Sequence, residues 1–130
     1  MCQTGLVVLG PMHDFHRLDV WKLSRRVAGG VYRITRGLPK DEAYGLKSQM
    51  RRASVSVASN IAEGASRGSP KEFKRFVQIA SGSANELETQ LLIASDAGLI
   101  PKQQATDLAN DIERIRKMLY SLERSTGPST

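Results

Sequence analysis

The sequence has 130 residues and a mass of 14.3 kDa, the size of one ordinary domain, which argues against paired catalytic lobes or separate cofactor and substrate domains. Hydrophobic residues make up 40% of the chain but aromatic residues only 5%, so we expect an aliphatic core of the kind that packed helices form. The formal net charge of +6 and the pI near 9.8 favour a polyanionic partner.

Residues 1–13 precede the first periodic segment, and we expect them to form a flexible N-terminal extension. Their apolar stretch lacks a basic flank and is much shorter than the roughly 18 residues of a membrane helix, so we expect neither a signal peptide nor a membrane anchor. The single cysteine, Cys2, has no partner for an internal disulfide, which is typical of a reducing compartment. We therefore expect a cytoplasmic protein.

The first predicted helix runs from about Asp14 to Gly37, and the second from about Ala43 to Ala65. Apolar residues recur along both at a spacing of three and four, which is typical of a helix with one buried face. The first stripe comprises Val20, Leu23, Val27, Val31 and Ile34, and the second comprises Leu46, Met50, Ala53, Val57 and Ile61.

The third predicted helix has the clearest boundaries: Ser69 can cap it, Pro70 occupies its first position, Glu72 can complete a capping box, and Gly98 follows its end. The fourth starts at Pro101. The third stripe comprises Phe73, Phe76, Val77, Ala80, Ala84, Leu87, Leu91 and Ala94, and the fourth comprises Leu108, Ile112, Ile115, Leu119 and Leu122. Short turns between four helices predict an all-α fold, an antiparallel up-down-up-down four-helix bundle over residues 14–124, with a disordered tail at 125–130.

Basic side chains gather on one face of the first predicted helix, opposite its apolar stripe. Residues 1–37 carry six basic and two acidic side chains, and no acid interrupts the stripe. Like charges repel along a helix, so a stripe of one sign favours an external anion such as nucleic acid. Of the nucleic acids, we expect RNA in preference to DNA. A solubilising face that binds nothing specific is the alternative. The predicted nucleic-acid-binding face comprises Lys22, Arg25, Arg26, Arg33 and Arg36 on the first helix with Lys47, Arg51 and Arg52 on the second.

Two further features could contact nucleic acid. Trp21 and Tyr32 lie at the edge of the basic stripe, where they could stack on bases, although packing at the bundle edge is the favoured interpretation. Free backbone N–H groups at the start of the third helix could hold a phosphate, although a plain helix connection is favoured there. The possible phosphate contacts at that end are Arg67, Lys71, Lys74 and Arg75.

The second and third predicted helices carry small or apolar residues on both of their faces. A helix that is apolar on both sides is buried on both sides, and four helices cannot cover that second face. We therefore expect a homo-oligomer. The predicted interface comprises Val55, Ala58, Ala62, Ile79, Gly82 and Ile93, and hydrogen-bonded structural roles are expected for Asn60 and Glu86 near these seams.

Catalytic groupings are missing from the sequence. His13 and His16 form a poor metal site at the start of the chain, and no Glu-x-x-His pairs exist for a di-iron bundle. No histidine is placed to activate a serine, and Gly64 to Lys71 lacks the Gly-Lys-Ser/Thr ending and the preceding strand of a P-loop. We expect no enzymatic activity, no metal and no cofactor.

Several stretches of the sequence resemble the bacterial 23S rRNA-intervening sequence proteins, a family related to the accessory variability determinant proteins of diversity-generating retroelements. The stretches are Phe15 to Trp21, Tyr44 to Ala53, Ser59 to Gly64, Glu72-Phe73 and Glu86 to Leu91. The resemblance implies four-helix bundles assembled as a ring-like homopentamer. It also implies an alternative function, a protein-interaction scaffold or accessory subunit for a nucleic-acid enzyme such as a reverse transcriptase.

Overall fold

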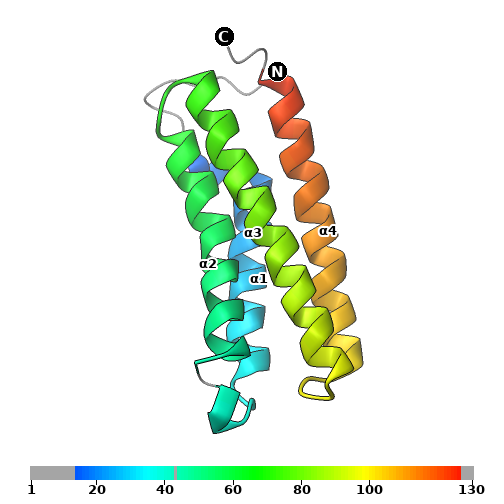
Figure 1. The fold of residues 1–130 in the computed structure, drawn as a ribbon. Helices are drawn as coiled ribbons and strands as arrows, with labels where there is room; N and C mark the ends of the chain where they lie inside the picture. Colours follow the sequence, from blue (N-terminus) through cyan, green and yellow to red (C-terminus); the bar gives the residue numbers. More distant parts are fainter. Residues whose placement is uncertain (1–13, 43, 127–130) are drawn as a thin grey trace.

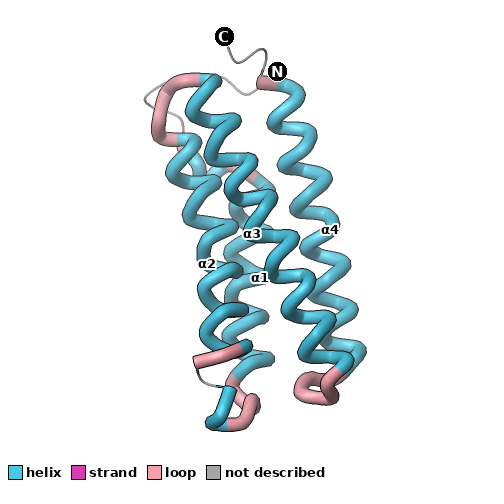
Figure 2. The backbone as a smooth tube through the Cα atoms, in the orientation of Figure 1, coloured by secondary structure: helices cyan, strands magenta, loops and turns pink. Residues whose placement is uncertain are grey.

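The computed structural model describes residues 14–42 and 44–126, which form four long helices and no strand. The helices are α1 (Asp19–Thr35), α2 (Leu46–Ala65), α3 (Pro70–Asp96) and α4 (Lys102–Ser125), and two 3₁₀ turns, η1 (Phe15–Arg17) and η2 (Lys40–Glu42), precede α1 and α2. Figure 1 shows the four long helices lying side by side, and Figure 2 shows the loops confined to their ends. The predicted all-helical class is confirmed for these residues, whereas the predicted extension 1–13 and positions 127–130 of the predicted tail lie outside them.

Each helix packs against two others. Helix α1 contacts α2 and α4, and α3 contacts α2 and α4, whereas among the described residues no Cα atoms of α1 and α3, or of α2 and α4, come within 8 Å of each other. The four predicted apolar stripes meet in one core, in which Ile34, Leu46, Leu108 and Leu122 are partly buried and the remaining stripe residues are buried. The core is therefore aliphatic apart from Phe73 and Phe76 of α3.

The ends of α3 follow the sequence signals. Ser69 Oγ accepts a hydrogen bond from the Glu72 N–H at 3.3 Å, and Pro70 is the first helical residue. The Glu72 carboxylate does not complete the predicted capping box, because it pairs with Arg75 at 3.7 Å. At the other end, Gly98 adopts the left-handed conformation (φ 74°), and the Leu99 N–H donates to the Ala94 carbonyl at 2.9 Å. This is a Schellman cap, in which a residue without Cβ is favoured.

The predicted starts of the first two helices are wrong by several residues. Helix α1 begins at Asp19, because Leu18 is extended and the Asp14 carboxylate caps the short η1 turn through the His16 N–H at 3.0 Å. Helix α2 begins at Leu46, whose N–H donates to the Glu42 carboxylate at 3.2 Å. The Asp14 side chain thus caps the turn ahead of α1, whereas the Glu42 side chain caps the first residue of α2 itself.

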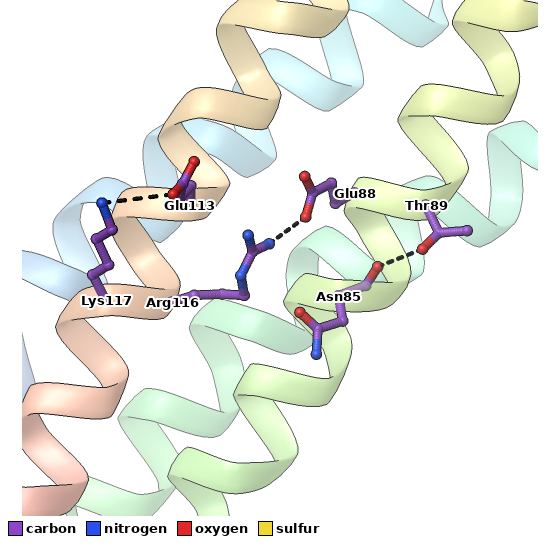
Figure 3. Close-up of polar contacts among 6 residues, drawn as sticks. All are labelled: Asn85, Glu88, Thr89, Glu113, Arg116 and Lys117. Carbon is purple, nitrogen blue, oxygen red and sulfur yellow. Dashed lines mark hydrogen bonds and ion pairs between the residues drawn. The ribbon is translucent and has the colours of Figure 1, made fainter.

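Helices α2 and α3 approach closely at Gly64, where a Cβ atom would lie 2.7 Å from the Cβ of Phe76. Further along this seam, Ser56 and Ser83 share a hydrogen bond at 2.8 Å. The α3–α4 seam carries an ion pair instead, between Glu88 and Arg116, which Figure 3 shows beside the exposed Glu113–Lys117 pair of α4. Within the described residues, no helix is both long and apolar enough to cross a membrane.

Candidate nucleic-acid interface

The basic side chains predicted on α1 are all exposed along one face of this helix. Lys22, Arg25, Arg26 and Arg33 line one shallow surface groove with Gly29 between them, and Arg36 lies just beyond the end of α1. This arrangement follows from the helical period, since the opposite face of α1 carries the buried Val20, Leu23, Val27 and Val31.

The α1 cations have no acidic partner in the described part of the chain. None of the four groove residues has a carboxylate oxygen within 4.0 Å of its charged nitrogen atoms. Some cations elsewhere in the described residues are paired, such as Arg67 with Glu63 at 3.0 Å and Arg114 with Asp111 at 3.4 Å, whereas others, such as Lys71 and Lys102, are not. Charges without internal partners are available to an external anion.

The three basic residues predicted on α2 differ in their surroundings. Arg52 is exposed and Lys47 is half-buried. Arg51 is held by α1, because its Nε donates to Thr35 Oγ1 at 2.9 Å and its Nη2 donates to the Tyr32 carbonyl at 3.1 Å. Its guanidinium carbon also lies 4.4 Å from the centre of the Tyr32 ring. Arg51, which was predicted to be part of the binding face, thus joins α2 to the end of α1.

Both aromatic residues at the edge of the basic face have internal partners. The Trp21 ring meets Phe15 edge-on at 5.1 Å, and Arg25 lies 5.7 Å from its centre. Tyr32 is covered on one side by Arg51. These contacts favour the packing interpretation of the two residues over base stacking.

At the start of α3, two of the four possible phosphate contacts are engaged with other side chains. Arg67 and Arg75 lie 5.1 Å and 4.7 Å from the centre of the Phe76 ring, and each also pairs with a carboxylate. Lys71 is exposed and Lys74 is half-buried, and neither forms an ion pair in the described part of the chain. The engaged arginines make this end of the molecule less open to phosphate than the α1 groove.

The residues predicted to form an oligomer interface lie on the outer faces of α2 and α3. Val55, Ile79 and Ile93 are 42%, 39% and 51% exposed, and the position of a Cβ on Gly82 has no atom within 4 Å. The two remaining members, Ala58 and Ala62, are half-buried.

The two polar residues predicted near these seams take part in hydrogen bonds. Asn60 Nδ2 donates to the Ser56 carbonyl at 2.8 Å, which connects it to the Ser56–Ser83 bridge between α2 and α3. Glu86 is exposed, and one of its oxygens accepts a hydrogen bond from Gln90 Nε2 at 3.3 Å. Both contacts are within one helix, whereas the Ser56–Ser83 hydrogen bond joins α2 to α3.

No cluster of three or more histidine, cysteine, aspartate or glutamate side chains that could hold a metal ion occurs among residues 14–42 and 44–126. His16 pairs with Asp14, its Nδ1 lying 2.6 Å from Oδ1, and its ring stacks on Phe15 at 4.2 Å. Its predicted companion, His13, lies outside the described residues.

Comparison with known proteins places the chain in a family. A crystal structure of a protein with unknown function from the S23 ribosomal protein family of Bacteroides thetaiotaomicron has a TM-score of 0.73 and 25% sequence identity, over 81% of this chain and 98% of that one. No curated protein matches the sequence. The model of the 23S rRNA-intervening sequence protein family matches residues 16–121. The chain therefore belongs to the 23S rRNA-intervening sequence protein family.

Proposed function

We propose that this chain is a non-enzymatic, oligomeric nucleic-acid-binding protein of the cytoplasm that contacts RNA phosphates through the basic face of α1 and the start of α2. The observation that carries the proposal is the α1 groove, in which Lys22, Arg25, Arg26 and Arg33 are exposed and have no carboxylate within 4.0 Å. Phosphate groups replace the missing acidic partners, and the release of counterions makes such binding strongly dependent on salt.

The assembly belongs to the same proposal. An antiparallel up-down-up-down four-helix bundle is the repeating unit, and the apolar outer faces of α2 and α3 join copies into a ring-like homo-oligomer, a pentamer by resemblance to the family. The exposure of the apolar Val55, Ile79 and Ile93 supports this assignment, since apolar side chains left in solvent are covered in an interface. Light scattering tests it: Ile79→Glu is expected to lower the particle mass to that of smaller species, whereas Tyr120→Glu, at an exposed site on α4, leaves it unchanged. A monomer mass for the unmodified chain would refute the assembly.

Binding is tested by fluorescence anisotropy with a labelled RNA over a series of salt concentrations. Four groove cations per copy predict a slope of about −3 for the logarithm of the association constant against the logarithm of salt concentration, at about −0.7 per phosphate of a single strand. Reversing Arg25, Arg26 and Arg33 to Glu lowers the charge by two at each position, which changes the formal net charge from +6 to 0 and is expected to abolish binding.

The matched control reverses Lys102, Arg114 and Lys117, three exposed cations of α4, and makes the same change in net charge. If the two triple variants weaken binding equally, only the overall charge matters and the α1 face is not the site. If RNA is not retained but a protein partner survives nuclease treatment, the alternative accessory-subunit function replaces RNA binding.

A further inference from the structure

Tyr44, in the loop before α2, is the most exposed large hydrophobic side chain of the described residues, at 97%. Its ring has no aromatic neighbour and no cation against its face among these residues, in contrast to Trp21, Tyr32 and Tyr120. A large ring that is left in water, with both faces open, offers a flat apolar surface to a ligand.

The ring borders a hollow between α2 and α3 that is lined mainly by polar side chains. Ser48, Gln49, Arg52 and Glu86 line it together with Tyr44. Ser48 and Arg52 also line the neighbouring hollow on the α1 side of α2, which Lys47 borders, so the Tyr44 hollow adjoins the basic face.

The chemistry of this lining fits a nucleobase better than a phosphate or a protein surface. A phosphate alone would be repelled by the Glu86 carboxylate. The centre of a protein interface is usually depleted of charged residues, whereas this hollow contains both a cation and an anion. A base presents a π face for the tyrosine and amino groups for a carboxylate acceptor, and Glu86 uses only one of its two oxygens to accept from Gln90.

We propose that Tyr44 is a stacking platform for one unpaired base of the bound nucleic acid, with Glu86 accepting from the amino group of the base and with Lys47 and Arg52 on the flanking phosphates. This inference rests on the proposed function and narrows it to RNA with unpaired nucleotides. A base inside a duplex cannot stack on the ring, because both of its faces are already covered by neighbouring bases.

The test measures anisotropy with short single-stranded oligocytidine, oligouridine and a duplex of the same length, at one low salt concentration. Tyr44→Ala is expected to weaken oligocytidine binding about tenfold, within the range found for the loss of one stacked base, and to leave duplex binding unchanged. Tyr44→Phe keeps the ring and retains the affinity. Oligocytidine, which has an amino group, binds more tightly than oligouridine, which has none.

Tyr120→Ala is the matched control, since Tyr120 is also exposed but lies on α4, where Arg124 donates to its hydroxyl. If Tyr44→Ala leaves single-strand binding unchanged while the reversal of the α1 arginines abolishes it, the stacking proposal is overturned and the proposed function stands. If the unmodified protein retains no RNA, both are overturned. If Tyr44→Ala changes the particle mass in light scattering, the ring is a contact between copies of the chain and the stacking proposal is also overturned.

Discussion

Replacing Gly64 by alanine tests the close approach of α2 and α3. The added methyl carbon would lie 2.7 Å from the Cβ of Phe76 and 3.5 Å from the Cδ1 of Phe73. Phe76 Cβ is bonded directly to the α3 backbone, so one helix must shift rather than one flexible side chain. Overpacking of this kind costs about 1–3 kcal/mol, and the better helix propensity of alanine offsets up to about 1 kcal/mol of it. The expected net loss of stability is about 1–2 kcal/mol.

Gly29→Ala provides the matched control, because it makes the same change in the middle of α1. There the new methyl carbon would meet only the flexible end of Arg33, at 3.4 Å, so alanine is expected to stabilise the protein by about 0.5–1 kcal/mol. Urea unfolding measures both variants at one protein concentration, since the stability of an oligomer depends on concentration. A Gly64→Ala protein that is as stable as the unmodified chain, with an unchanged m-value, would show that the helices are not in contact at Gly64.

Three further predictions concern polar contacts. Arg51→Met removes two hydrogen bonds to α1 and is expected to cost about 1–3 kcal/mol in urea unfolding; no loss would mean that the arginine is not held by α1. Glu88→Ala breaks the partly buried ion pair between α3 and α4 and is expected to cost about 1–2 kcal/mol, against about 0.5 kcal/mol or less for Glu113→Ala, whose pair is more exposed. The side-chain and backbone hydrogen bonds from His16 hold the pKa of Asp14 below its ordinary value of 3.8, so any stability from this group is present above that value and is lost as pH falls through the lower, folded one. NMR titration of Asp14 measures its pKa, which is expected to rise in His16→Ala. A pKa that does not rise in this variant would contradict the role of His16.

The core and the ends of α3 follow from periodicity and capping, which are local properties of the sequence. Ser69, Pro70 and Gly98 each act within a few residues of their own position, and the structure places them as predicted. The starts of α1 and α2 were not predictable from the same signals, because the Asp14 carboxylate caps the η1 turn and the Glu42 carboxylate caps Leu46, and the apolar period registers neither contact.

The candidate site shows the same division between local and non-local properties. The exposed stripe on α1 follows from the helical period alone. The engagement of Arg51 does not, because it depends on where the end of α1 comes to rest against α2. Tyr44 was not predicted to be a binding residue. An isolated aromatic residue beside a helix start usually belongs to the core, and only the folded chain shows this one in solvent.

Helix α2 packs against both α1 and α3, as α4 does, but α2 also carries residues of both the basic face and the proposed oligomer interface, whereas α1 carries only the former and α3 only the latter. A substitution on α2 that shifts the helix would disturb the basic groove and the apolar outer face together. Variants that separate the proposed RNA binding from the proposed assembly must therefore be sought on α1 and α3. A genetic screen for chains that assemble without binding RNA should recover changes in α1, and one for chains that bind without assembling should recover changes in α3.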